Sequence, residues 1–503
     1  MKYISALLIL TFSIMAAKKP NIIIFLVDDM GMMDTSVPFI TDANNKAQIQ
    51  DLNKYFKTPA MEKLASKGIR FNQFCAQSVC SPSRASIISG QNATRHQTTT
   101  WINPSSNNRG RFGPHKWNWH GIKAGTPVLP KVLSEAGYRT IHIGKAHFGN
   151  KAAAASDPTK IGFQFNVGGD CWGRPKSYYS EDHYGNHPKY KTKKRPLTHN
   201  VPHLEKYYDS GTFLTEALTL ETIKLLKKSV VDKTPFFLHM SHYALHSPFN
   251  SDPRFAANYK NTGKSPRAQA FATLVEGMDK SLNDIMNTLE KLNIAEDTLI
   301  IFLGDNGSDA PLGAIHEVAC AAPLRGKKGT HYEGGMRVPF IAAWAKPNAE
   351  NKFQKQLPIS QNSIQTQMAT VMDIYPTLLE LANIASPVKH EVDGRSLKKL
   401  FSGTADANHP KSFLMHFPHD HRSDYYTTYR TQDWKLIYHY NPKNPSDSHC
   451  ELFHLKNDPY EQKEISSSNP EKVSALKKAM LNQLKKEGAL FPIDKDGNPL
   501  IPR

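Results

Sequence analysis

The sequence predicts an α/β fold, with a large mixed, mostly parallel sheet between layers of helices and a smaller C-terminal α+β subdomain. Three observations predict it. Four continuous apolar runs of strand length occur between residues 21 and 303, and such runs are typical of strands buried on both faces. Helical stretches separate the runs. In the last hundred residues, two short stretches are predicted to pair as strands and one helix follows them.

The first apolar run, residues 21–27, is followed directly by Asp28 and Asp29. Two adjacent carboxylates repel each other unless a cation lies beside them. The carboxyl end of a strand in an open α/β sheet is also where functional sites form. The pair therefore predicts a cation site, with an ordinary solvated turn as the alternative.

A short stretch, residues 78–90, combines a cysteine with signals for a helix start and a helix stop. Pro82 suits the first turn of a helix and Gly90 suits its end, so Cys80 is expected at or just before the N-terminus. Free backbone N–H groups there favour an oxyanion, and Arg84 adds a cation one turn on. The alternative is a buried cysteine before an ordinary helix.

Three further apolar runs end in polar side chains, like the first. Residues 138–143 precede Lys145 and His147, residues 235–241 precede His242 and His246, and residues 298–303 precede Asp305 and Asn306. A lone lysine or histidine is more often a solvated surface residue. A pair directly after a strand favours a functional role.

Helices are expected between these strands. One opens at Thr58-Pro59, and others cover residues 126–136, 212–228 and 271–289. A long segment, residues 171–208, is rich in Tyr, His, Lys and Pro and includes Lys189, Lys191, Lys193, Lys194 and Arg195. A loop of this length in a compact domain is usually functional or disordered.

The main domain is predicted to end near residues 397–403. Beyond it, residues 429–437 and 451–459 are expected to pair as strands, and a helix covers about 470–488. We therefore divide the chain into a signal peptide (1–17), a catalytic domain (18–405) and a C-terminal subdomain (406–503).

The motif Cys80-x-Pro82-x-Arg84, followed by a small residue and by Gly90, resembles the signature of the type I, formylglycine-dependent sulfatases of the alkaline phosphatase superfamily. The chain is similar to exported bacterial carbohydrate sulfatases and arylsulfatases over nearly all of its mature length, with the motifs in family order. Residues 324–335 resemble a second sulfatase signature and assign a sulfate-binding lysine to Lys328. Family members often carry other residues where Lys327 and His331 stand, which leaves fine specificity open.

The resemblance implies a complete site. Its catalytic residues are Cys80, Arg84, Lys145, His147, His246 and Lys328. One Ca²⁺ ion is held by Asp28, Asp29, Asp305, Asn306 and the modified Cys80. This donor set consists of oxygens and indicates Ca²⁺ or Mg²⁺, not zinc. A formylglycine-generating or anaerobic sulfatase-maturating enzyme is the implied partner that oxidises Cys80.

The implied reaction is hydrolysis of a sulfuric ester. Hydrated formylglycine attacks sulfur, His246 protonates the leaving sugar oxygen, and His147 takes a proton from the remaining hydroxyl to expel sulfate. Two alternatives remain: a phosphate or phosphonate monoester hydrolase of the same superfamily, and a non-catalytic sulfoglycan-binding protein if Cys80 is never oxidised. A third alternative, an exported nucleic-acid-binding protein, is supported by the net positive charge alone.

The composition is typical of a globular protein, and the N-terminal segment indicates export. The apolar run at 4–15, after Lys2, is too short for a membrane helix and is typical of a secretory signal, so we expect a periplasmic or secreted protein with no membrane span. Five cysteines, an odd and sparse set, do not indicate a disulfide framework, and a single disulfide between an undetermined pair is the alternative. The net charge of +18 favours polyanions such as a sulfated polymer, with a generally lysine-rich proteome as the alternative. Export argues against nucleic acid.

The substrate is expected to be a sulfated carbohydrate, oligosaccharide or polysaccharide. The basic and aromatic segment 171–208 suits a sulfated sugar, although a solvated charge run is an alternative. His242 follows a strand near the site, and His416, His419 and Arg422 lie before the C-terminal strands. We expect these four residues to contact the sugar, with a capped surface loop as the alternative for the histidines.

Overall fold

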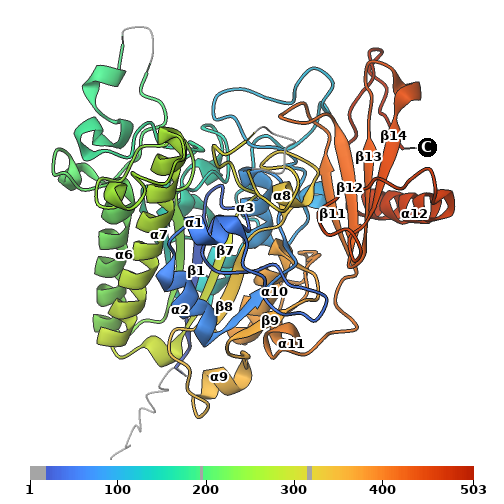
Figure 1. Cartoon of the computed structure of the whole chain (residues 1–503). Helices are drawn as coiled ribbons and strands as arrows, with labels where there is room; N and C mark the ends of the chain where they lie inside the picture. Colours follow the sequence, from blue (N-terminus) through green and yellow to red (C-terminus); the bar gives the residue numbers. More distant parts are fainter. Residues whose placement is uncertain (1–17, 193–195, 314–319, 503) are drawn as a thin grey trace, which may run out of the picture.

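The computed structural model describes residues 18–192, 196–313 and 320–502. Its main sheet has eight strands in the order β5-β4-β6-β1-β7-β8-β2-β9 (Figure 1). The strands are β1 (Asn21–Val27), β2 (Ile69–Phe71), β4 (Arg139–Gly144), β5 (Phe165–Val167), β6 (Phe236–His242), β7 (Thr298–Gly304), β8 (Phe340–Trp344) and β9 (Ser363–Gln365). The predicted signal peptide and residues 193–195 of the basic segment lie outside the described residues.

The main sheet is mixed but mostly parallel, as predicted. Neighbours from β5 through β7 are all parallel, and so are β2 and β9. Only β8 runs antiparallel to its neighbours, β7 and β2, among the described strands. The four strands β4, β6, β1 and β7 are therefore adjacent, and their carboxyl ends meet at one edge of the sheet.

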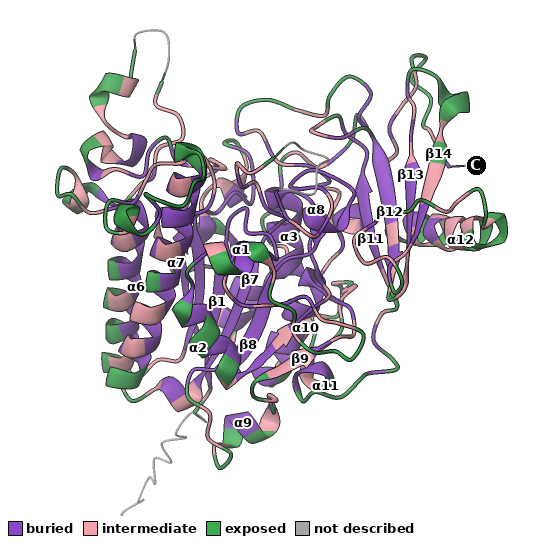
Figure 2. Ribbon diagram, viewed as in Figure 1, coloured by how far each residue is buried: buried purple, intermediate pink, exposed green. Residues whose placement is uncertain are grey.

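Helices cover both faces of the main sheet. On β1, Ile23 and Phe25 pack with α2 (Pro59–Lys67), α6 (Leu214–Val231) and α7 (Pro266–Lys291). Ile22 and Ile24 point the other way and pack with α3 (Cys80–Ser89), α5 (Leu129–Glu135) and α10 (Ile374–Leu381). Figure 2 shows the resulting buried sheet and the exposed outer side of α6. A strand that is buried on both faces needs apolar residues at every position, which explains the continuous runs.

The remaining elements are short. The helices are α1 (Asp51–Tyr55), α4 (Ala93–His96), α8 (Glu333–Met336), α9 (Lys352–Gln356) and α11 (Lys398–Phe401), and β3 (Phe74–Cys75) pairs with β10 (Ala369–Thr370). The 3₁₀ turns are η1 (Ala154–Ser156), η2 (Pro158–Ile161), η3 (Ser180–Gly185), η4 (Pro188–Tyr190), η5 (Glu205–Tyr207), η6 (Ala256–Asn258), η7 (Ala295–Asp297), η8 (Val371–Asp373) and η9 (Pro445–Asp447).

A separate antiparallel sheet follows, in the order β11 (Ser412–Phe417), β12 (Tyr426–Thr431), β13 (Trp434–His439) and β14 (His449–His454), with α12 (Pro470–Glu487) beside it. The single strand expected over residues 429–437 is wrong. This stretch holds the end of β12, a tight turn at Gln432 and Asp433, and the start of β13. The turn lets the chain fold back into a hairpin.

The two faces of the C-terminal sheet pack on different partners. Leu414 and Leu436 pack against Met480 of α12. Phe413 and Met415 face the main domain and pack with residues that include Met336. The contact with the main domain also contains a buried ion pair, because Arg430 of β12 donates to the Glu333 carboxylate at 3.1 Å from both Nε and Nη2.

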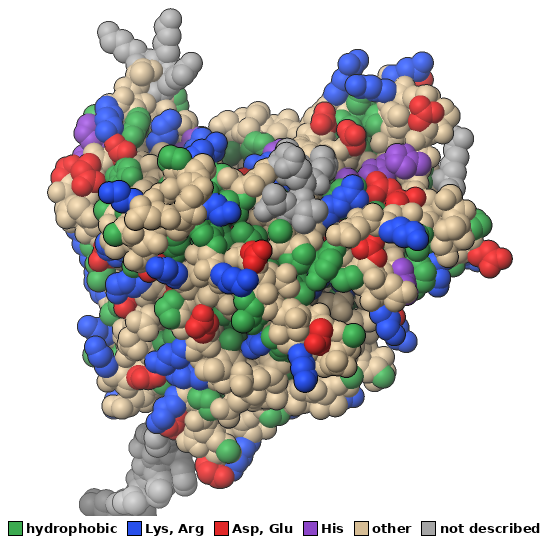
Figure 3. Space-filling model, viewed as in Figure 1, with side chains coloured by type: hydrophobic (Ala, Val, Ile, Leu, Met, Phe, Trp, Pro, Cys, Tyr) green, Lys and Arg blue, Asp and Glu red, His purple; other side chains and the backbone are tan. Residues whose placement is uncertain are grey.

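Within the described ranges, no helix is both long enough and apolar enough to cross a bilayer. The five cysteines lie within the described ranges and form no disulfide there. Figure 3 shows lysine and arginine side chains scattered over one face, with acidic side chains between them. On this face the positive charge therefore forms no single continuous patch.

Candidate active site

Cys80 is the first residue of α3, as predicted. Val79 before it is extended, and Gly90 ends the helix with φ at +69°, a left-handed conformation that favours glycine. The Cys80 side chain is buried at the helix start, where unpaired backbone N–H groups gather. This position favours negative charge beside Cys80.

His147 faces Cys80 from the loop after β4. Its Nε2 lies 2.7 Å from the Ile102 carbonyl oxygen, so Nε2–H donates there and leaves Nδ1 as an acceptor. That Nδ1 lies 3.4 Å from Cys80 Sγ. Gly173 packs against the imidazole so closely that a Cβ would lie 2.6 Å from Cε1. Burial, and then Lys145, lower the pKa of His147 well below its usual value, which keeps the ring neutral.

Arg84 lies beneath the pocket and is fully buried. Its Nε donates to Asp305 at 2.8 Å, and its Nη1 donates to the Lys145 carbonyl oxygen at 2.8 Å and to Ser241 at 2.7 Å. Burial alone would lower the pKa of Arg84, but Asp305 raises it above the usual value. Arg84 therefore ties α3 to the ends of β4, β6 and β7.

An acidic cluster lies at the ends of β1 and β7. Oxygens of Asp28, Asp29 and Asp305 lie within 4.8 Å of one another, and all three side chains are buried. The Asn306 amide donates to Asp29 at 3.0 Å, while its buried Oδ1 has no hydrogen-bond partner in the described part of the chain. A buried acceptor without a partner is costly unless something binds it.

Burial raises the pKa of Asp28, and the nearby Asp305 and Asp29 raise it further, although Lys145 opposes this shift. A divalent cation among these oxygens would relieve both the repulsion and the unpaired Asn306 oxygen. The chemistry of the donor set, carboxylates plus one amide oxygen, therefore fits a hard cation such as Ca²⁺ or Mg²⁺.

Two lysines contact the acidic cluster. Lys145 Nζ lies 2.7 and 2.8 Å from the two oxygens of Asp28, and Lys328 Nζ lies 2.7 Å from Asp29. Burial would raise the pKa of Asp29, but Lys328 and then His246 hold it well below its usual range. Both ammonium groups are therefore held against the acidic cluster, and Lys328 also lines the cavity.

His246, from the loop after β6, has its Nε2 3.6 Å from Asp29. Burial, and then Lys328, hold the pKa of His246 well below its usual value. Its Nδ1 lies 2.9 Å from the Ser247 carbonyl oxygen. His246 is thus neutral in the ligand-free site, with Nε2 on the side of the acidic cluster.

Four of the predicted catalytic side chains line a cavity of about 260 Å³. Its deep part includes Cys80, His147, His246 and Lys328, as the sequence predicted. Its rim adds side chains that sequence reasoning did not single out, namely Trp101, Trp172, Arg174, His199 and His421. Three of these five come from the segment 171–208, and His421 lies beside the predicted Arg422, which also lines the cavity. A loop without periodicity carries no signal for which side chains point inward.

His242, His416 and His419 do not line this cavity, which corrects the expectation that they contact the sugar. Each is fully buried in protein contacts. His242 Nε2 lies 2.9 Å from Ser281 Oγ, His416 Nδ1 lies 2.7 Å from Thr427 Oγ1, and His419 Nε2 lies 2.8 Å from Thr99 Oγ1. Lys189, from the basic segment 171–208, forms an ion pair with Asp182 and does not line the cavity.

The buried histidines predict loss of stability in acid. Burial lowers the pKa of His416 to about 4 and that of His419 to about 3, from 6.5. Below pH 6.5 the unfolded chain binds protons that the folded chain cannot, so the free energy of unfolding falls by about 1.4 kcal/mol per pH unit for each such histidine.

We therefore expect denaturant titrations between pH 6.5 and 4.5 to show falling stability. His416→Gln, which does not titrate, should reduce the slope by about 1.4 kcal/mol per pH unit. His115→Gln, at an exposed position, is the control. Equal slopes in all three proteins would contradict the prediction.

Comparisons with known proteins identify the family. A family model described as Sulfatase matches residues 20–384, and one described as N-sulphoglucosamine sulphohydrolase, C-terminal, matches residues 327–489. A sulfatase from Formosa agariphila is 29% identical over 90% of this chain and 86% of its own. The mouse N-acetylgalactosamine-6-sulfatase is 28% identical over 76% of this chain, which spans 66% of that enzyme's length.

The fold is also shared with solved structures. The crystal structure of Ps i-CgsB superimposes with a TM-score of 0.74 at 23% identity, covering 95% of this chain and 96% of that one. A likeness at this identity shows the fold, and the family model shows the family. The chain belongs to the sulfatase family of the alkaline-phosphatase-like superfamily and is a sulfuric ester hydrolase.

Proposed function

We propose that this enzyme removes sulfate from a sulfated carbohydrate with a formylglycine made from Cys80 and one bound Ca²⁺. One observation carries the proposal. The Cys80 side chain lies at a helix N-terminus, 3.4 Å from the acceptor nitrogen of His147, in a cavity shared with Lys328 and His246.

Two groups complete the proposed site. Formylglycine supplies a hydrated aldehyde, which has one hydroxyl to attack sulfur and a second whose proton can be removed to release sulfate. Ca²⁺, held by Asp28, Asp29, Asp305, Asn306 and the modified residue 80, supplies charge that stabilises anionic oxygens. The other contributions come from the side chains of this chain.

His147 is suited to accept a proton at residue 80. Its Nε2–H is committed to Ile102, so the lone pair is on Nδ1, which lies 3.3 Å from Ser81 Oγ and 3.4 Å from Cys80 Sγ. Its lowered pKa keeps that lone pair available at neutral pH. We assign His147 as the base that releases sulfate.

The cations stabilise the reacting group. Lys328 lines the cavity and Lys145 lies beneath it, and both are buried, where a charge acts over a longer range than in water. We assign both to the sulfuryl oxygens. Arg84 binds Asp305 through Nε, and Ser241 and the Lys145 carbonyl oxygen through Nη1, and so holds this arrangement in place. Its buried Nη2 lies 3.6 Å from Asp28 and makes no hydrogen bond with the described residues.

His246 is assigned as the acid for the leaving oxygen. Its pKa in the ligand-free site is lowered first by burial and then by Lys328, with a smaller contribution from Lys145. A bound sulfate ester brings a negative charge next to both groups and so favours the imidazolium form. Substrate binding would therefore load the proton that the leaving alkoxide needs.

The rim of the cavity suits an acidic sugar. Trp101 and Trp172 offer aromatic faces, and no carboxylate lines the cavity among the described residues. Arg174 has no carboxylate within 4.0 Å in the described structure, and burial lowers its pKa. A half-buried guanidinium without an anion favours a ligand that brings one. The N-acetylgalactosamine-6-sulfatase relatives are named for a sulfated sugar, in line with this proposal.

Arg174→Gln tests the rim. We expect kcat/KM on a sulfated oligosaccharide with a second anionic group to fall about 10- to 100-fold, because a charge-assisted hydrogen bond is lost. A small aryl sulfate cannot reach the rim, so its kcat/KM should change little. Arg422→Gln should behave alike, although Arg422 is also paired with Asp309 at 2.6 and 2.9 Å. Lys176→Gln, an exposed cation two residues after Arg174, is the control. Equal losses on both substrates would remove Arg174 from sugar recognition.

Two other functions are separated by simple measurements. A phosphate or phosphonate monoester hydrolase would prefer the phosphate over the sulfate ester of one phenol. A sulfoglycan-binding protein would keep an unmodified cysteine in the residue-80 peptide, which its mass would reveal. A screen of defined sulfated oligosaccharides, with products identified by mass, tests the proposed function itself.

We further propose that the chain is exported to the periplasm or secreted after removal of residues 1–17. A formylglycine-generating or anaerobic sulfatase-maturating enzyme would act on Cys80. The catalytic domain would then cover residues 18–405 and the C-terminal subdomain residues 406–503. The start of β11 at Ser412 supports this division.

A further inference from the structure

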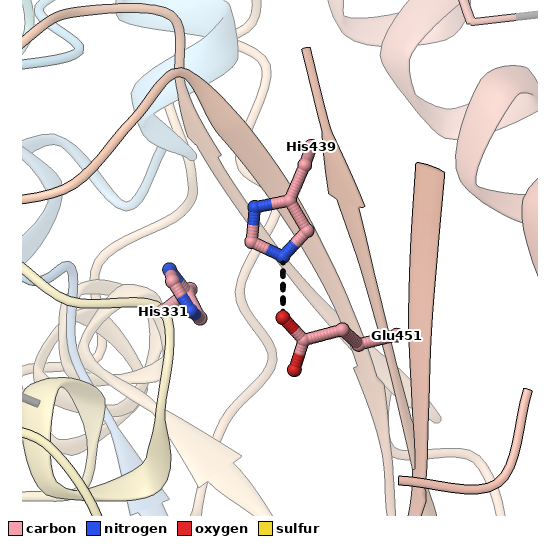
Figure 4. A group of neighbouring side chains, drawn as sticks. All are labelled: His331, His439 and Glu451. Atoms are coloured by element: carbon pink, nitrogen blue, oxygen red, sulfur yellow. Dashed lines mark ion pairs between the residues drawn. The ribbon is translucent and has the colours of Figure 1, made fainter. Parts of the chain in front are cut away.

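A second cluster of metal-ligand side chains lies at the contact between the main domain and the C-terminal sheet. Among the described residues, His331, His439 and Glu451 each place one ligand atom within 4.8 Å of the others'. His331 comes from the loop that carries Lys328, His439 ends β13, and Glu451 lies on β14. Figure 4 shows the His439 ring directed at the Glu451 carboxylate, with His331 on the other side.

The register of the C-terminal sheet brings two of these residues together. Ile437 pairs with Glu451 and His439 pairs with His449, so His439 and Glu451 are diagonal neighbours on one face. His439 Nε2 lies 2.9 Å from Glu451 Oε1. One imidazole nitrogen and one carboxylate oxygen therefore lie close enough to bind the same ion.

Contacts around the cluster orient its members in the way that metal ligands are oriented. His331 Nδ1 lies 2.9 Å from Ser423 Oγ, a contact that orients the imidazole ring. The Tyr332 hydroxyl donates to Glu451 Oε2 at 3.3 Å, on the carboxylate oxygen that does not contact His439. The two imidazole rings are perpendicular, with centroids 4.8 Å apart. Two histidines that bind one Zn²⁺ at about 2.1 Å in tetrahedral geometry have ring centroids about 5 Å apart.

We propose that His331, His439 and Glu451 bind one Zn²⁺ ion that joins the Lys328 loop to the C-terminal sheet. Two neutral imidazoles and one carboxylate form a common zinc ligand set, with the fourth position taken by water. The ion lets both histidines face one carboxylate without two imidazolium charges meeting. The site is distinct from the all-oxygen cluster around Asp29. His331, one of its ligands, is three residues from Lys328 in the sequence. His331 also contacts Ser423, the neighbour of Arg422.

Co²⁺ titration of the full-length enzyme, without a histidine tag and with Ca²⁺ kept saturating, tests the site. We expect one equivalent of Co²⁺ to give the strong visible absorption of low-coordinate N/O sites, and Zn²⁺ to displace it. Zn²⁺ should also raise the unfolding temperature by mass action. His439→Gln and Glu451→Gln should each weaken Co²⁺ binding by more than the roughly 10- to 100-fold that loss of an outer hydrogen bond costs.

His449→Gln is the matched control, because His449 stacks on His439 at 4.7 Å without belonging to the cluster. It should keep full Co²⁺ binding, as should Asp29→Asn in the other cluster. Glu451→Gln preserves side-chain volume and the acceptor for Tyr332, so it decides the question if His439→Gln fails to fold. No visible band in the parent enzyme, or an unchanged band in Glu451→Gln, would overturn the proposal and leave only an ion pair.

Discussion

Cys80→Ala is expected to abolish sulfate release while leaving the fold intact. The alanine has no group that can attack sulfur, and removal of a covalent nucleophile typically costs about 10⁴-fold or more in rate. The side chain is small and lies at the first position of α3, where alanine is a good helix former. Release of sulfate from a sulfated sugar, with circular dichroism as a check on folding, measures both effects.

Two companion variants sharpen this test. Cys75→Ala removes another buried thiol, five residues earlier, and should keep activity. Cys80→Ser keeps one hydroxyl. Its Oγ could attack sulfur and displace the alcohol, but the serine carbon has no second hydroxyl from which His147 could take a proton. The residue-80 peptide should therefore gain the mass of one sulfuryl group and turn over no further. Appreciable multiple-turnover activity in Cys80→Ala would refute the assignment of the nucleophile.

The sequence predicted the core of the site because its residues follow a simple rule. Asp28, Lys145 and Asp305 each come directly after an apolar run, and parallel strands place their carboxyl ends at one edge of the sheet. The helix start at Cys80 was equally visible, since Pro82 and Gly90 mark its two ends. The family resemblance added roles to these positions, and the geometry brings the residues together.

The substrate contacts could not be predicted in the same way. His416 lies inside β11, where its neighbours and not its chemistry decide its direction, and it turns into the C-terminal core. Arg422, beyond the strand, has φ at +59° and reaches the cavity through an irregular loop. Trp172 and Arg174 likewise depend on a loop without periodicity.

The hairpin of β12 and β13 was missed for a related reason. Its turn, Gln432 and Asp433, contains neither glycine nor asparagine, the residues that most often mark a two-residue hairpin.

Two departures from the family pattern gain partners in the structure. Lys327 lies 3.4 Å from Asp309, the partner of Arg422, and His331 belongs to the cluster with His439. Both departures from the family pattern, at residues 327 and 331, therefore connect the loop of Lys328 to residues of the C-terminal part of the chain.

Removal of the metal from the acidic cluster is expected to cost both rate and stability. Without a cation, Asp28, Asp29 and Asp305 remain together in a buried site and repel one another. A ligand at 100 times its Kd stabilises the fold by about 2.7 kcal/mol, so chelation should lower the unfolding temperature by several degrees. We expect kcat/KM to fall at least about 10³-fold, and Ca²⁺ to restore it. Full activity in metal-free enzyme would contradict this.

Variants at single ligands locate the ion. Asp29→Asn should lose bound Ca²⁺ by elemental analysis, whereas Asp34→Asn, a buried carboxylate outside the cluster, should retain it. Asn306 gives the sharper comparison, because its Oδ1 is buried and has no hydrogen-bond partner among the described residues. If that oxygen binds no ion, Asn306→Leu removes an unpaired acceptor and leaves the metal content unchanged. If it is a ligand, Asn306→Leu loses Ca²⁺ while Asn306→Asp, which keeps an oxygen there, retains it. We expect the second result, since a bound cation would satisfy an amide oxygen that is buried beside three carboxylates.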